Sequence, residues 1–373
     1  MKKKMNFDTN VKYKPAMIAM IITVIVFSIM LTGCGGKRGQ EPASSAEAAV
    51  SAEKTAVSGP AVPEDQAGST AQKDADAQTA AAQEIAVQKF PLKVTDAGGV
   101  AMTIDREPQR IVSLTLGSDE ILLGLIDKSR ILALTKYADD AGISNISAEA
   151  AGVAARATMD NLENVIALKP DLVILDTWAD AKYVKQLRDA GINVYAFKTP
   201  SNIDEQKTII AEISNIIGAD AKGQEMTEWM SSKLKEMEEK LAKLKREDKL
   251  TVLDYGEMGS SGRGTNFDDI VTRAGLINVV SEAGIEGWRV ISKEKIIEFN
   301  PDIIILPSWY YDQSNSLQGM INTLKGDKSL QTVKAISRGR LISIPNPHIS
   351  AISQYVVLAV EDVARAAYPE LFE

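Results

Sequence analysis

The fold is decided by two stretches of sequence that follow one pattern, NLENVIALKPDLVIL (161–175) and SKEKIIEFNPDIIIL (292–306). Matching positions lie 131 residues apart throughout, without a gap. Each stretch opens on an N-cap residue, Asn161 or Ser292, which predicts the start of a helix. Each then reaches Pro-Asp, which turns the chain into a short apolar run typical of a buried strand. The pattern therefore indicates a duplicated α/β unit.

One acidic residue occupies the same place in both copies, Glu163 in the first and Glu294 in the second. An acid in the first turn of a helix is stabilised by the helix dipole, by about 0.3–1 kcal/mol. The helix dipole accounts for each glutamate taken by itself. It does not require that the same position be acidic in both copies, so that each of two related lobes carries one glutamate.

Short apolar runs alternate with helical patterns on both sides of the repeat, which favours doubly wound α/β lobes. We predict two such lobes, at residues 90–218 and 249–373, with a ligand cleft between them. The first lobe opens with a hairpin, from Leu92 to Ile104. Further strands are expected at Ile111–Leu116, Ile131–Leu134, Leu172–Leu175, Val194–Phe197, Thr251–Tyr255, Ile303–Leu306 and Leu341–Ile344.

A single long helix, within residues 219–248, is predicted to join the lobes. From Met226 to Leu244 its apolar residues recur every three or four positions, which makes one stripe. A helix from Asp220 to Glu247 would be roughly 40 Å long, more than one small lobe needs. The last helix of the chain is expected from Ser350 to Ala367.

The N-terminus resembles a bacterial lipoprotein signal. Basic residues precede an apolar run from Ala16 to Leu31, and Leu31-Thr-Gly-Cys34 follows. The resemblance implies removal of residues 1–33 and a diacylglycerol on Cys34. The alternative is a permanent membrane anchor, because the run is nearly long enough to span a bilayer. Residues 34–89 hold no aromatic side chain and read as a disordered tether.

Composition excludes several classes of site. The formal net charge is −8, and removal of five Lys and one Asp with residues 1–33 leaves −12, so an electrostatic nucleic-acid binder is not expected. One cysteine and one histidine, His348, exclude a disulfide, a Cys cluster and a multi-His zinc site. No cofactor motif occurs, and no resident cofactor is expected.

Several motifs in order resemble the substrate-binding lipoproteins of bacterial ABC importers for ferric siderophores, haem and cobalamin. They begin with FPLKVTDAGG (90–99), PQRIVSL (108–114) and SDEIL (118–122), and continue through both repeat copies and the long helix. The resemblance covers about residues 90 to 372. It implies two α/β lobes on a rigid backbone helix, with the ligand between them. It also implies that Glu163 and Glu294 dock on arginines of a permease, which works with an ATPase. The chain itself is then expected at the outer face of the cell membrane, held by its lipid anchor.

The candidate ligand contacts are residues at or near predicted strand ends. Aromatic faces suit flat or apolar organic ligands, and Arg suits carboxylates, catecholates and hydroxamates. The set is Arg156, Trp178, Arg263, Trp288, Trp309, Tyr310 and His348. His348 or Tyr310 would ligate metal only if the ligand is haem. The mixture slightly favours an iron–siderophore complex over haem or cobalamin.

Two other function classes stay open. A tethered sensor or scaffold lipoprotein would bind ligand without a permease. A nitrogenase-like or chelatase-like enzyme could use Asp171, Asp302 and the Gly256–Gly264 loop. The symmetry of Glu163 and Glu294 favours the importer component, which is not an enzyme.

Overall fold

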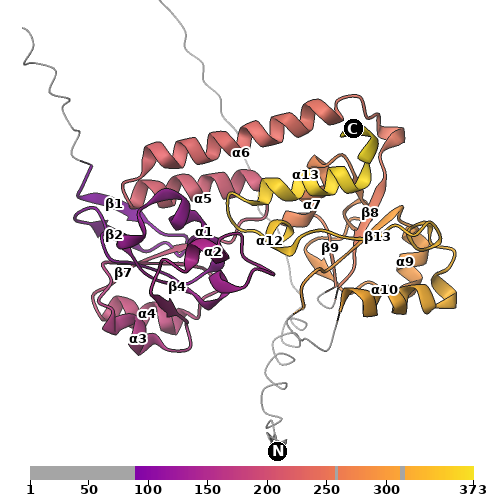
Figure 1. The fold of residues 1–373 in the computed structure, drawn as a ribbon. Helices are drawn as coiled ribbons and strands as arrows, with labels where there is room; N and C mark the ends of the chain where they lie inside the picture. The colour runs from indigo at the N-terminus through magenta and orange to yellow at the C-terminus, as the bar shows by residue number, and fades with distance from the viewer. Residues whose placement is uncertain (1–88, 257–258, 311–315) are drawn as a thin grey trace, which may run out of the picture. The chain divides into compact units, whose positions relative to one another are not determined.

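The computed structural model describes residues 89–256, 259–310 and 316–373. Cys34, the predicted signal peptide and most of the predicted tether lie outside these residues. The described chain forms two α/β lobes, drawn in indigo to magenta and in orange to yellow in Figure 1. Within the described part, no helix is both long and apolar enough to cross a bilayer.

The N-terminal lobe is built on a five-stranded parallel sheet of order β5-β4-β3-β6-β7. The predicted hairpin precedes it, with β1 (Leu92–Thr95) antiparallel to β2 (Ala101–Ile104). The sheet strands are β3 (Ile111–Ser113), β4 (Ile131–Thr135), β5 (Ala155–Ala157), β6 (Leu172–Asp176) and β7 (Asn193–Phe197). The helices are α1 (Leu116–Leu125), α2 (Ser147–Ala150), α3 (Leu162–Ala167), α4 (Ala181–Asp189) and α5 (Ile203–Ile216).

The C-terminal lobe is built on a four-stranded parallel sheet of order β10-β8-β12-β13. Its strands are β8 (Thr251–Asp254), β10 (Ile277–Asn278), β12 (Ile303–Leu306) and β13 (Leu341–Ser343). A short antiparallel pair, β9 (Ser260–Ser261) and β11 (Trp288–Arg289), accompanies it. The helices are α7 (Asn266–Arg273), α8 (Val279–Glu282), α9 (Lys293–Phe299), α10 (Leu317–Gly326), α11 (Lys334–Ser337), α12 (Asn346–Ile349) and α13 (Val356–Ala367).

The two repeat copies adopt the same local structure. Asn161 and Ser292 cap α3 and α9 through their side chains. The residue before each proline is left-handed, with φ of 49° at Lys169 and 45° at Asn300. This conformation reverses the chain from helix to strand, although most side chains avoid it.

The aspartate after each proline then anchors a neighbouring strand. Asp171 accepts hydrogen bonds from the N–H groups of Gln109 and Arg110, just before β3, at 2.9 Å each. Asp302 accepts from the N–H and hydroxyl of Thr251, at the start of β8, at 3.1 and 2.7 Å. The central strand pairs β3·β6 and β8·β12 are therefore fixed in the same way.

The predicted long helix is α6 (Asp220–Leu241), which contacts α1 and α5 of the first lobe and α7 and α13 of the second. Figure 1 shows it running alongside α5 and then α13. Its buried residues include Met230 and Met237. They belong to one apolar cluster that continues through both lobes, from Ile121 on α1 to Val360 on α13.

Several predicted elements have different limits. The strand predicted to reach Leu116 ends at Ser113, because Thr115 caps α1 by accepting from the N–H of Ser118. The long helix ends at Leu241 instead of Glu247. The last helix, predicted from Ser350, begins at Val356 as α13, and a separate short helix, α12, ends at Ile349.

Candidate functional site

Exposed aromatic side chains follow two parallel strands of the first lobe and lie on the short antiparallel pair of the second lobe. Trp178 follows β6, and 78% of it is exposed. Trp288 on β11 is 58% exposed, and Tyr137 after β4 is 43% exposed. Large aromatic side chains left open to water mark a ligand or partner surface. Trp178 belongs to the first lobe and Trp288 to the second.

Asp176 fixes the loop that presents Trp178. Its carboxylate accepts a hydrogen bond from the Trp178 N–H at 3.0 Å. Burial raises the pKa of Asp176, and this hydrogen bond opposes that effect. The indole therefore extends from a loop whose backbone is held at the end of the strand.

Trp309 crosses from the second lobe to the first. Its Nε1 donates to Oδ2 of Asp140 at 3.2 Å. Gly142 lies against the ring, since a Cβ placed there would be 2.6 Å from Cδ1 of Trp309. Trp309 therefore closes part of the junction between the lobes. Tyr310, by contrast, is only 9% exposed and directs its hydroxyl toward Sδ of Met320, 3.9 Å away.

Arg156 has its donors engaged within its own lobe. Its guanidinium binds the Asp139 carboxylate through Nε at 2.7 Å and Nη2 at 2.5 Å. It also donates to the carbonyls of Ala150, Val153 and Ala155. This pairing holds the pKa of Asp139 below its usual range. A ligand anion would have to compete with a bidentate carboxylate to reach Arg156.

Arg263 and His348 differ in how far their side chains are free to contact a ligand. Arg263 is exposed, and its Nη2 donates a long hydrogen bond, 3.3 Å, to the carbonyl of Ser281. His348 lies on α12, and its Nδ1 is 2.6 Å from Oδ2 of Asp362 on α13. Within the described residues, no group of three or more His, Cys, Asp or Glu is arranged to hold a metal.

The two repeat glutamates are exposed, one on each lobe. Glu163 lies in the first turn of α3 and Glu294 in the first turn of α9. A hydrogen bond from Ser292 lowers the pKa of Glu294, so this carboxylate is charged at neutral pH. Both side chains are accessible to a macromolecular partner.

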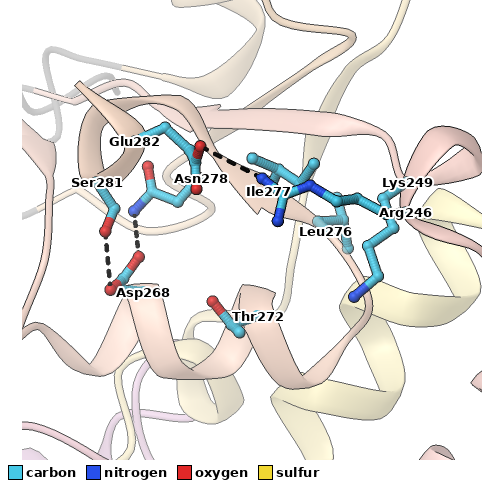
Figure 2. A pocket seen from close by; sticks show the side chains of 9 residues that line it. All are labelled: Arg246, Lys249, Asp268, Thr272, Leu276, Ile277, Asn278, Ser281 and Glu282. Atoms are coloured by element: carbon cyan, nitrogen blue, oxygen red, sulfur yellow. Dashed lines mark hydrogen bonds and ion pairs between the residues drawn. The ribbon is translucent and has the colours of Figure 1, made fainter.

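Two pockets of the described structure lie elsewhere, within the second lobe. One, of about 360 Å³, is lined by α7, β10 and α8, where Asp268 accepts from Asn278 and Ser281 at 2.9 and 3.2 Å (Figure 2). The other, of about 350 Å³, includes Tyr255, Lys293 and Met320. None of the predicted ligand contacts, all of which are described, lines either pocket.

Residues 111–347 match the family model described as periplasmic binding protein, and this span covers most of both lobes. The chain belongs to the periplasmic binding protein family. This agrees with the resemblance deduced from the repeat and with the two-lobed α/β fold. Members of this family are solute-binding proteins, not enzymes.

Three proteins illustrate what this chain is similar to. The ABC transporter substrate-binding lipoprotein YvrC of Bacillus subtilis is 26% identical over 302 residues, 76% of this chain and 88% of YvrC. A cobalamin-binding protein of Halobacterium salinarum is 22% identical over 280 residues, 74% of this chain and 73% of that one. Molybdate-bound MolA of Haemophilus influenzae has a TM-score of 0.62 at 21% identity, covering 75% of this chain and 92% of MolA.

Sequence reasoning missed the polar residues that join the lobes of this binding protein. Glu120 is buried on α1 and accepts hydrogen bonds from Asn145 and from Ser353 of the second lobe. The signal was present, since Asp119 and Glu120 stand consecutively at the start of the apolar run Ile121–Leu125. Two acids on the buried side of a helix need partners. Their partners, however, are far away in the sequence.

Proposed function

We propose that this chain is the extracytoplasmic substrate-binding lipoprotein of an ABC importer, which captures an iron complex between its lobes and delivers it to a permease. The observation that carries the proposal is the pair of exposed indoles, Trp178 and Trp288, one on each lobe. Family membership and the similarity to ABC transporter substrate-binding proteins support the transport role.

The ligand that best fits is a ferric siderophore. Its organic faces suit the exposed aromatics. Its negatively charged groups suit the exposed cations Lys136, Arg263 and Arg289. Lys136 and Arg289 are the chain neighbours of Tyr137 and Trp288, and Arg263 follows β9, the strand that pairs with β11. No described acidic cluster of the metal-binding kind accompanies them, so the protein would hold the organic part of the complex and not the bare ion.

Cobalamin is the second candidate, for two specific reasons. Arg156 is engaged by Asp139, which removes one of the cations expected to pair with an anionic chelate. The relative from Halobacterium salinarum is described as a cobalamin-binding protein. Haem has less support, because its expected axial ligands His348 and Tyr310 lie against Asp362 and Met320.

The test is a thermal-shift and fluorescence titration of the full chain with ferric siderophores, cyanocobalamin and haem. A bound ligand at 100 times its Kd should stabilise the fold by about 2.7 kcal/mol. Trp178→Ala and Trp288→Ala should each weaken binding by about 1.5–3 kcal/mol, because a stacked aromatic face is lost. Trp229→Ala, on α6 and 38% exposed, is the matched control and should leave affinity unchanged. If none of these compounds raises Tm or quenches the fluorescence, the proposed ligand class is wrong.

We propose further that Cys34 carries the lipid anchor and that Glu163 and Glu294 dock on arginines of the permease. Exposure of both glutamates at equivalent helix starts supports docking. Two fixed charges on separate lobes would set the orientation of the complex and raise the encounter rate.

A further inference from the structure

The junction between the lobes contains a buried carboxylate that belongs neither to the proposed ligand contacts nor to the proposed docking contacts. Glu120 on α1 is 1% exposed. Its Oε1 accepts from the N–H and the Nδ2 of Asn145 at 2.8 and 3.0 Å. Its Oε2 accepts from the hydroxyl of Ser353, in the segment before α13. Asn145 also donates to the carbonyl of Pro347 at 2.7 Å. One carboxylate therefore gathers donors from both lobes.

The helix that carries Glu120 also touches the other lobe through its backbone. A Cβ placed on Gly117 would lie 2.4 Å from the carbonyl oxygen of Ile352. Nε2 of Gln354 donates to the carbonyl oxygen of Glu120 at 3.0 Å. The residues from Ile352 to Gln354 therefore lie directly on one face of α1, with no space for a side chain at Gly117.

The neighbouring residue Asp119 differs from Glu120 in which lobe its hydrogen-bond partners come from. Asp119 is also fully buried, but its carboxylate accepts from the N–H and hydroxyl of Thr135 in its own lobe. Both acids pay the desolvation cost of burial. Removing either leaves buried donors unpaired, but only Glu120 leaves a donor of the second lobe unpaired.

We propose that Glu120 is a positioning residue that fixes the separation of the two lobes. It acts through Asn145 and Ser353 and does not touch the ligand. It thereby sets the distance across which Trp178 and Trp288 can hold one molecule. The part concerning the ligand rests on the proposed function, whereas the part concerning lobe separation does not.

The lobe separation can be measured without ligand by double electron–electron resonance. Spin labels are placed at the exposed residues Lys182 on α4 and Lys325 on α10, in the full chain with Cys34→Ser. Glu120→Ala should broaden the distance distribution and shift its mean. Asp119→Ala, the matched control, should lower Tm but leave the distribution as in the parent chain. An unchanged distribution in Glu120→Ala, or an equal broadening in Asp119→Ala, would overturn the proposal.

Three further variants keep the test decisive if Glu120→Ala does not fold. Glu120→Gln keeps an acceptor for Asn145 and should restore the parent distribution. Ser353→Ala removes only the bond from the second lobe and should broaden the distribution. Gly117→Ala should displace the mean, because its methyl group meets the Ile352 carbonyl, whereas Gly326→Ala meets nothing within 4 Å and should not. Parent-like distributions in both Ser353→Ala and Gly117→Ala would contradict the assignment. Failure of every compound to bind would contradict the proposed function and leave these distances unaffected.

Discussion

At the scale of single residues, the partners of each charged side chain decide what that residue can do. Arg156 is the clearest example, because its bonds to Asp139 and three carbonyls make it a brace within the first lobe. A sequence shows an arginine near a strand end, but not whether a carboxylate has already engaged it. Trp178, Trp288 and Arg263 are exposed and remain the candidates for contact with a ligand.

Asp119 predicts a specific dependence of stability on pH. Burial raises its pKa from 3.8 in the unfolded chain to about 7 in the fold, against the opposing hydrogen bonds of Ser113 and Thr135. Its contribution to the free energy of unfolding is therefore fully present below pH 3.8 and is lost as pH rises toward about 7. We expect the Tm of Asp119→Asn, relative to the wild type, to increase as pH is raised from about 4 to 8.

Asp327→Asn is the control for that titration. The hydrogen bond from Lys293 lowers the pKa of Asp327 to about 2. The contribution of Asp327 to the free energy of unfolding is therefore present above pH 3.8 and is lost only as pH falls toward 2. Its effect on Tm should be constant between about pH 5 and 8. A difference between Asp119→Asn and wild type that does not vary with pH would show that the Asp119 carboxyl titrates normally in the fold.

At the scale of elements, the duplicated helix starts predict a defect in transport without a defect in ligand binding. Glu163→Gln combined with Glu294→Gln removes the charge of two exposed carboxylates. If they are desolvated against arginines, loss of one partner costs about 2–5 kcal/mol of docking free energy. Uptake, or ATP hydrolysis by the reconstituted transporter in the presence of ligand, should fall strongly while ligand Kd stays the same.

Two other exposed acids provide the matched control for docking. Glu149 on α2 and Glu282 on α8 also lie in first turns, one on each lobe. Glu149→Gln with Glu282→Gln changes net charge equally and should leave uptake normal. Normal uptake in the Glu163/Glu294 variant would rule out docking through these residues, and weakened ligand binding would assign them to the pocket.

Most of the fold was predictable from sequence because the repeat carries local signals. The caps, the Pro-Asp turns and the apolar strands depend on residues within a few positions of one another. The shorter pieces β5, β9, β10 and β11 were not predicted, because two or three residues give no periodicity. Their pairing is decided by tertiary contacts, such as the bond from Nδ2 of Asn278 to the carbonyl of Ser261.

The candidate site was predictable only in part, for the same reason. The exposure of Trp178 follows from its place in the loop after β6, whereas Trp288 lies on β11, a two-residue strand that was not predicted. The cross-lobe bond of Trp309 to Asp140 joins residues 169 positions apart. The Glu120–Ser353 bond spans 233 positions. No local sequence pattern predicts contacts between residues so far apart, so the junction between the lobes could be identified only from the structure.

At the scale of the whole molecule, the chain is expected to be attached to the membrane by a lipid on Cys34. The reason is the Leu31-Thr-Gly-Cys34 sequence after a basic and then apolar N-terminus. Radiolabelled palmitate supplied to expressing cells should label the wild type and not Cys34→Ser, with both detected at comparable amounts by immunoblot. Equal labelling of the two chains would contradict attachment at this residue.

The apolar cluster shared by both lobes has a consequence for how such a molecule can be recombined. Ile121, Met230 and Val360 come from three distant parts of the chain and belong to one interior. Neither lobe could therefore be cut out and expected to fold by itself, because each would expose the apolar side chains that the other lobe now covers. A chimaera that exchanges one lobe with a homologue would have to inherit the facing sides of α1, α5, α6, α7 and α13 together. For recombination between homologues, the two lobes therefore behave as one unit.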